Sequence, residues 1–147
     1  GMFDEFGLQS LVKTSGSKGL QMYVPLNTPV TYDDTKPFAH AIAMLMERRY
    51  RGRVTSNMNK ALRANKVFID WSQNADHKST VAVYSLRARE RPTVSTPVSW
   101  GEVENALGER DAGLLTFEPS GVLERYQRLG DLFAPLQELR QSLPSVG

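Results

Sequence analysis

The stretch Lys66–Asn74, which reads KVFIDWSQN, constrains the fold of this 147-residue chain more than any other segment. Its β-branched and aromatic residues are typical of a strand on a half-buried sheet. Asp70 places a carboxylate in that run, and a buried carboxylate must be hydrogen-bonded, paired or bound to a metal. With the two-residue period of a strand, Asp70 points away from Val67 and Ile69. We therefore expect Asp70 to face a cleft as a site residue or, alternatively, to cap the turn at 72–74.

Composition limits the class of protein. A length of 147 residues with 40% apolar residues indicates one domain with a hydrophobic core. The absence of cysteine excludes disulfides, thiolate zinc sites and cysteine nucleophiles. No apolar run approaches the ~20 residues of a membrane helix, and no signal segment opens the chain, so we expect a soluble, cytoplasmic protein without membrane contact. Gly1 before Met2 is interpreted as a cloning scar, which gives a predicted single domain over 2–147.

The net charge of +2 hides an asymmetry. Residues up to Val98 carry 6 Lys and 8 Arg against 8 acidic side chains, whereas the remainder carries 4 Arg against 8 acidic side chains. The first two-thirds is therefore expected to meet a polyanionic partner. The cluster Arg48–Arg53 at a predicted helix end has two interpretations, a solvated terminus favoured by the helix dipole or a phosphate-facing edge.

Hydrophobic spacing and turn residues predict an α+β fold with a mainly antiparallel sheet and helices packed on it. The alternation after Gly19 predicts a hairpin whose second strand buries Leu20 and Met22. Asp33 or Asp34 is expected to cap the first helix. The expected elements are strands at Ser10–Lys13, Leu20–Leu26, Lys66–Ile69, Thr80–Leu86 and Leu114–Phe117, and helices at Lys36–Tyr50, Asn57–Ala64, Trp100–Leu107 and Ser120 to about Leu143, the last broken near Gly130.

Candidate phosphate ligands surround Asp70 in the sequence. The turn Ser15–Gly19 (SGSKG) offers backbone N–H groups, a hydroxyl and an ammonium, but without Walker A spacing it is also consistent with an ordinary turn. Arg63 precedes Asp70, and Arg87 ends the next predicted strand, followed by further arginines. If the two strands are neighbours, both guanidiniums flank Asp70, as ligand-binding groups or in a salt bridge. The two histidines, His40 and His77, offer no catalytic constellation, and His40 is expected at the surface.

Three motifs carry a family resemblance. The combination of SGSKG, DWSQN and YSLRAR, within KTSGSKGLQMYVPL and ALRANKVFIDWSQNADHKSTVAVYSLRARERPTVSTPVSW, resembles the polymerase domain of bacterial ATP-dependent DNA ligase D, of the archaeo-eukaryotic primase superfamily. The resemblance extends over the chain and corresponds to the C-terminal half of that domain. It implies a primase-polymerase-like half domain, nucleotide addition to DNA ends in non-homologous end joining, and two divalent metals, Mn or Mg.

The resemblance also implies residue roles. Asp70 matches the third metal-site carboxylate and is the implied catalytic and metal residue. Ser15 and Lys18 match the triphosphate-binding turn, and Arg63, Gln73 and Arg87 match residues that contact the incoming nucleotide. Gln21 is a further possible contact, because several family members carry His there and Gln still donates a hydrogen bond but does not titrate near neutral pH.

Two departures from the family pattern limit the expected activity. The family's upstream D-x-D carboxylate pair does not occur in these 147 residues, and the adjacent Asp4 and Glu5 are no substitute. The family's N-terminal half, with its 5′-phosphate pocket, also has no counterpart. We expect the chain alone to be inactive. It is either part of a polymerase completed by another half, or a catalytically dead nucleotide- or nucleic-acid-binding module or truncated-gene relic. A sheet edge left open by the missing half predicts self-association or pairing with another chain.

Overall fold

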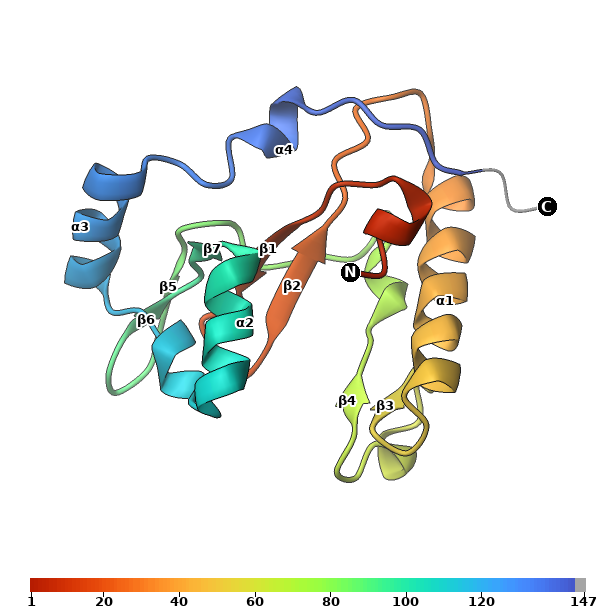
Figure 1. Ribbon diagram of the computed structural model, residues 1–147, viewed down its shortest axis with the longest axis horizontal. Coiled ribbons are helices and arrows are strands. Elements are labelled where there is room, and N and C mark those ends of the chain that lie inside the picture. The colour runs from red at the N-terminus through yellow and green to blue at the C-terminus, as the bar shows by residue number, and fades with distance from the viewer. Residues whose placement is uncertain (145–147) are drawn as a thin grey trace. The chain divides into compact units, whose positions relative to one another are not determined.

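The computed structural model describes residues 1–144, which fall into two compact units (Figure 1). Unit 1 contains Gly1–Asn27 and Val81–Ser142, and unit 2 contains Thr28–Thr80 with residues 143 and 144. The single domain predicted over 2–147 stays a prediction, and its last three residues lie outside the described part of the chain. Within residues 1–144, no helix is long and apolar enough to cross a membrane.

Unit 1 is built around a three-stranded antiparallel sheet with the order β2-β1-β7. The central strand β1 is almost wholly buried, with Val12 and Lys13 each 1% exposed. A separate hairpin, β5–β6, pairs Leu86 with Val94. The strands of unit 1 are β1 (Leu11–Thr14), β2 (Leu20–Tyr23), β5 (Leu86–Arg87), β6 (Thr93–Val94) and β7 (Pro97–Val98).

The helices of unit 1 begin with clear sequence signals. Ser99 caps α2 in a capping box with Glu102, and Pro119 opens α3, which ends at Gly130 with a positive φ of 71°. The helix predicted over 100–107 is therefore confirmed, and so is the break near Gly130, but the helical part after Gly130 ends at Glu138 rather than near Leu143. The helical elements of unit 1 are α2 (Trp100–Glu109), α3 (Pro119–Leu129), α4 (Pro135–Glu138) and the 3-10 helices Asp4–Phe6 and Ala112–Leu115.

The predicted β1–β2 hairpin is confirmed, but its buried side was predicted wrongly. Leu20 and Met22 are 42% and 49% exposed, whereas Gln21 and Tyr23 are half-buried. The reason lies in the side-chain partners on that side of the sheet. The Gln21 amide oxygen accepts a hydrogen bond from the buried Lys13, and the Tyr23 ring packs edge-on against Phe133 at 5.1 Å. A polar group that satisfies a buried ammonium is held inside more firmly than an aliphatic residue on an edge strand.

Unit 2 consists of one long helix with a short parallel ladder beside it (Figure 1). The helix is capped by Thr31 in a capping box with Asp34, so it begins earlier than predicted, and Thr31 rather than Asp33 or Asp34 is the cap. Phe38, Ile42 and Ala43 form its buried stripe. The elements of unit 2 are α1 (Tyr32–Arg49), β3 (Val54–Thr55), β4 (Val67–Phe68) and the 3-10 helices Lys60–Leu62 and Trp71–Gln73.

Several predicted elements are shorter or different. The strand predicted over 20–26 ends at Tyr23, and the strand predicted over 66–69 covers only Val67–Phe68. The helix predicted over 57–64 is only the 3-10 helix Lys60–Leu62, because Asn57 and Asn59 bind backbone N–H groups two residues on and favour turns. The strand predicted over 80–86 is reduced to β5, because Tyr84 adopts a φ of 63°. The extended piece predicted over 114–117 begins as the 3-10 helix Ala112–Leu115. The fold class, α+β with mainly antiparallel pairing, is confirmed.

Candidate functional site

The SGSKG turn joins β1 to β2 and is closed by its own backbone. The N–H of Ser15 donates to the carbonyl of Gly19 at 2.8 Å, and the Ser15 hydroxyl accepts from the N–H groups of Ser17 and Gly19 at 3.2 Å each. Ser15 therefore organises the turn from within. The N–H groups of Gly16 and Lys18 have no hydrogen-bond partner within residues 1–144. Two unused donors in a closed turn are the elements of an anion-binding nest.

Gly16 is the position in this turn that admits no side chain. Its φ is +67°, and a Cβ there would lie 2.6 Å from Cγ of Arg87 and 3.1 Å from the backbone N of Ser95. The Thr93 hydroxyl donates to the Gly16 carbonyl at 2.5 Å. The close approach of Arg87 thus depends on glycine, and the β5–β6 hairpin holds the turn in place.

Three cations lie at the turn. Lys18 is exposed and has no ion pair or hydrogen bond in the described chain. Arg87 is half-buried and packs against Gly16, and the Arg89 guanidinium donates to the Ser17 hydroxyl. No acidic side chain bonds to Lys18, Arg87 or Arg89 within residues 1–144. The structure therefore brings together Ser15, Lys18 and Arg87 of the predicted site, with excess positive charge beside unused N–H donors.

Beneath the turn, Lys13 is buried in a network of neutral acceptors. Its ammonium donates to the Gln21 amide oxygen at 2.5 Å, the Ser95 hydroxyl at 2.6 Å and the Val81 carbonyl at 2.9 Å. The Ser95 hydroxyl in turn donates to the Thr14 carbonyl at 2.8 Å. Burial, and secondly the positive charge of Arg87, lower the pKa of Lys13 to about 8. Gln21, a possible contact residue, is thus oriented by Lys13.

In unit 2, Asp70 caps the 3-10 helix Trp71–Gln73, so its predicted capping role is confirmed. One carboxylate oxygen accepts from the backbone N–H of Ser72 at 3.2 Å and its hydroxyl at 2.6 Å, and the other accepts from the Gln73 amide at 2.8 Å. Desolvation acts to raise the pKa of Asp70, but these hydrogen bonds and the charge of Lys78 outweigh it and lower that pKa. Asp70 is exposed, and its orientation towards a cleft stays a prediction.

Arg63 and Asp70 form no salt bridge within residues 1–144. Instead the Arg63 guanidinium lies over the Phe68 ring at 3.5 Å and donates to the Met58 carbonyl at 2.5 Å. β4 pairs with β3 and β5 with β6, so the neighbouring-strand arrangement expected for Arg63 and Arg87 is not found.

His40, expected at the surface, is half-buried and stacks on the Trp71 ring, with 4.0 Å between the ring centroids.

The residues of the described chain do not fit a two-metal site. No group of three or more His, Asp or Glu side chains within residues 1–144 is placed to hold a metal ion. Asp70 supplies one carboxylate whose two oxygens already accept hydrogen bonds from Ser72 and Gln73. A single carboxylate does not hold two divalent ions.

The residues that support the turn were not predicted from the sequence. Lys13, Thr93 and Ser95 fix its backbone, yet each reads as an ordinary strand residue. The one available signal is the lysine itself, since a lysine in an apolar strand is rarely buried unless it is paired. Arg89 could have been found from the alternation of Arg87 and Arg89 after the YSL segment.

Comparison with known proteins gives consistent matches. Residues 1–133 match the family described as LigD, primase-polymerase domain. The multifunctional non-homologous end joining protein LigD of Mycolicibacterium smegmatis is 42% identical over 135 residues, covering 92% of this chain and 17% of that protein. The bifunctional non-homologous end joining protein LigD of Bacillus subtilis is 35% identical over 107 residues, covering 72% of this chain and 18% of that protein.

A solved structure shows the same fold. The polymerase domain from Mycobacterium tuberculosis ligase D in complex with DNA superposes with a TM-score of 0.84 at 41% sequence identity. The alignment covers 95% of this chain and 47% of that chain. The present chain thus spans about half the length of that solved domain and less than a fifth of the curated relatives named above.

Proposed function

Because the chain belongs to the LigD primase-polymerase domain family, we propose that it is the nucleotide-binding part of a DNA end-joining polymerase. The SGSKG turn with Arg87 holds the phosphates of an incoming nucleoside triphosphate. The observation that carries this proposal is the pre-formed turn, in which the free N–H groups of Gly16 and Lys18 lie beside exposed positive charge. Such a turn needs no rearrangement to receive phosphate oxygens.

Asp70 contributes one metal-binding carboxylate to the reaction of the complete polymerase, and Arg63 and Gln73 contact the nucleotide, as the family resemblance implies. The remaining metal-binding carboxylates come from residues outside these 147. With the other carboxylates of the complete site, Asp70 would hold a divalent metal, Mn or Mg, which would supply charge stabilisation to the transferring phosphoryl group. In this chain the Gln73 amide and the Ser72 hydroxyl keep the Asp70 carboxylate ionised and fixed in orientation.

Titration calorimetry with a nucleoside triphosphate tests the phosphate site. Lys18→Ala with Arg87→Ala is expected to weaken binding by about 100-fold or more, because each of the two charge-assisted hydrogen bonds to phosphate contributes about 1.5–3 kcal/mol. Arg91→Ala is the matched control, since Arg91 is an exposed arginine further along the same segment with no ligand role. Arg63→Ala tests the predicted contact from unit 2 separately.

The proposal fails if the parent chain shows no saturable binding or if the double variant binds as tightly as the parent. Primer extension with manganese and ribonucleotides is a separate measurement on the same protein. The isolated chain is expected to give no extension, because Asp70 is the one metal-site carboxylate that the family resemblance assigns to this sequence. Retained nucleotide binding without extension favours a binding module that requires other residues for catalysis.

A further inference from the structure

A basic segment of unit 2 contains, besides Arg63, cationic side chains that the nucleotide site does not use. Between Glu47 and Asp70 the sequence contains no aspartate or glutamate, and it carries seven cationic side chains, at Arg48, Arg49, Arg51, Arg53, Lys60, Arg63 and Lys66. Arg48, Arg51, Arg53 and Lys66 are all exposed. We call these four residues the basic strip. Exposed positive charge of this density favours a polyanion.

The fold gathers the strip at one end of α1. The chain leaves the helix through a tight turn in which the N–H groups of Arg53 and Val54 both donate to the Tyr50 carbonyl, at 3.0 and 3.2 Å. The parallel ladder then pairs Val54 with Val67, and the Val67 N–H donates to the Arg53 carbonyl at 2.8 Å. Arg53 and Lys66, distant in sequence, therefore lie at the ends of adjacent strands, beside the C-terminal end of α1 (Figure 1).

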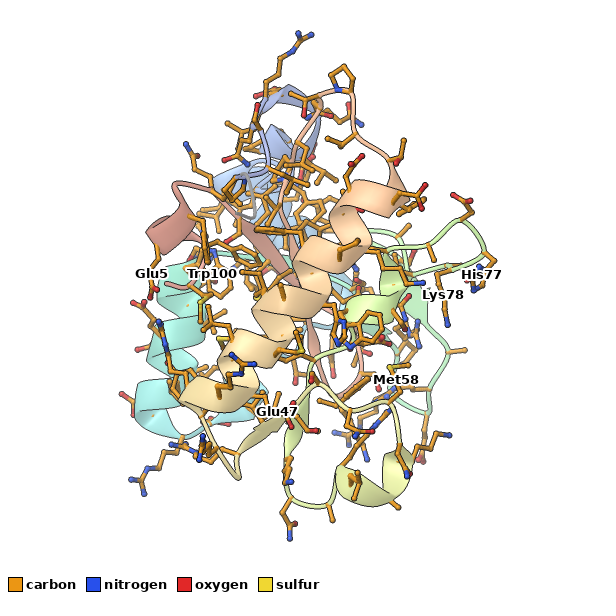
Figure 2. The ribbon with its side chains drawn as sticks, turned by 90° about the vertical axis from the view of Figure 1, so that its right-hand side faces the viewer. Glu5, Glu47, Met58, His77, Lys78 and Trp100 are labelled. Atoms are coloured by element: carbon orange, nitrogen blue, oxygen red, sulfur yellow. The ribbon has the colours of Figure 1, made fainter. Side chains whose placement is uncertain are left out.

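Glu47, the acidic residue nearest to the strip in sequence, uses its carboxylate in hydrogen bonds within the fold. Figure 2 shows Glu47 near the C-terminal end of α1. Its carboxylate accepts hydrogen bonds from the Ser56 hydroxyl at 2.5 Å, the Ser56 N–H at 3.1 Å and the Thr55 hydroxyl at 3.1 Å. These hydrogen bonds, those of Ser56 most of all, lower the pKa of Glu47. The Glu47 carboxylate thus links α1 to β3 and Ser56 through hydrogen bonds. It forms no ion pair with the strip's arginines within residues 1–144, and the charge of Lys66 makes the smallest contribution to its lowered pKa.

The helix dipole does not account for the whole strip. It favours cations in the last helical turn, which here contains Arg48 and Arg49, and its effect falls off within that turn. Arg51 and Arg53 lie beyond the helix, and Lys66 precedes another strand. A solvated helix end therefore explains the first of these charges, and Lys66 interacts electrostatically with Glu47, which leaves Arg51 and Arg53 without a structural role.

We propose that the basic strip binds the phosphate backbone of duplex DNA. Three of its four cations are arginines, whose planar guanidinium matches the geometry of a phosphate. The related polymerase domain from M. tuberculosis was solved in complex with DNA, which makes duplex DNA the polyanion to test. Contacts to phosphate set affinity and position on the duplex without reading its sequence. The inference does not depend on the SGSKG turn, because the strip lies in the other unit.

Fluorescence anisotropy with an end-labelled duplex, measured over a salt series, tests the strip. Arg48→Gln, Arg51→Gln and Arg53→Gln together are expected to weaken binding about 10- to 100-fold at low salt and to reduce the slope of log K against log salt by about 2–3, because each phosphate contact contributes about 0.9 to that slope. The matched control is Arg110→Gln, Arg128→Gln and Arg140→Gln, which removes the same charge from exposed arginines of unit 1. The control is expected to change the slope by less than about 1.

Replacing the same three strip arginines by lysine keeps the charge and is expected to retain the salt slope. Equal slopes for the strip variant and the control would overturn the inference, because they would mean that only the net charge of the chain matters. A parent chain that does not bind the duplex would overturn it as well.

Nucleotide calorimetry on the strip variant separates the two proposals. The strip variant should bind nucleotide as the parent does, whereas Lys18→Ala with Arg87→Ala should lose nucleotide and keep the duplex.

Discussion

Lys13 shows how much one buried residue determines around the SGSKG turn. With 1% exposure and three neutral hydrogen-bond acceptors, it has no carboxylate to offset its desolvation. Its position therefore costs folding free energy as long as it carries a proton. In return its hydrogen bonds orient Gln21 and connect β1 to Ser95, which holds the backbone at Thr14.

The lowered pKa of Lys13 predicts a stability that increases in mild alkali. The pKa is about 8 in the folded chain against 10.5 for an unperturbed lysine, so the unfolded chain binds more protons between these values. The free energy of unfolding should rise through this pH window by at most about 1.4 kcal/mol per pH unit. Burial and Asp131 raise the pKa of Tyr84, which opposes this rise only above about pH 10, where tyrosines of the unfolded chain ionise.

Urea unfolding between pH 7.5 and 9.5 measures this effect. Lys13→Met should remove the rise, although it also lowers stability at all pH values because Gln21 and Ser95 lose their donor. Lys18→Met, at an exposed lysine five positions along, should retain the rise. The same pH dependence in parent and Lys13→Met would show that the titrating group is elsewhere.

Residue roles were partly accessible from the sequence. The cap formed by Asp70 could be predicted because it depends on residues two and three positions away. The partners of Arg63 could not, because the contact with Phe68 depends on how the loop before β4 folds. Lys13 was missed for a related reason, since its partners lie 8 to 82 positions away in sequence.

At the scale of elements, α2 and α3 are connected by a buried ion pair. Arg125, 9% exposed, donates to both carboxylate oxygens of Glu102 at 2.5 and 2.6 Å, and to the Pro97 carbonyl at 3.3 Å. The same Glu102 accepts from the Ser99 N–H at 2.8 Å in the capping box of α2. The Glu102 carboxylate therefore caps the N-terminus of α2 and also forms the ion pair that links α2 to α3.

Glu102→Gln should destabilise unit 1 by about 2–3 kcal/mol, because it leaves the buried Arg125 unpaired, a cost reduced here by the partial exposure of Glu102. Ser99→Ala removes the cap but keeps the ion pair, and should cost about 1 kcal/mol. Chemical denaturation of the two variants gives the comparison. If Ser99→Ala costs as much as Glu102→Gln, the ion pair adds nothing beyond the cap.

Helices were easier to predict than strands in this chain. The helices α1, α2 and α3 have apolar spacing and end signals within their own sequence. Most strands are two residues long, too short for an alternating pattern, and their pairing depends on distant segments. The strand expected over 80–86 failed at Tyr84, whose positive φ has no sequence signal.

At the scale of the whole molecule, β2 is an edge strand of its sheet within the described residues, with Leu20 and Met22 exposed on it. An apolar edge of this kind favours pairing with another strand. Light scattering should therefore give a mass above that of one chain, and Met22→Lys should shift the protein towards the monomer. Leu107→Lys is the control, because Leu107 is 76% exposed and belongs to the helix α2 rather than to the edge strand. A compact monomer at all concentrations would rule out self-association through β2.

The two units also differ in how the chain builds them, with a consequence for synthesis on the ribosome. Unit 2 is nearly contiguous, from Thr28 to Thr80, whereas unit 1 needs both Gly1–Asn27 and Val81–Ser142. The sheet of unit 1 pairs Val12 with Val98, so about seventy residues are synthesised after β2 before β7 is available to complete the sheet. During that interval the helix and ladder of unit 2 can already form. A pause in translation before β7 would therefore leave the β1–β2 hairpin uncovered in the growing chain, at the stage when it is most open to a chaperone or to aggregation.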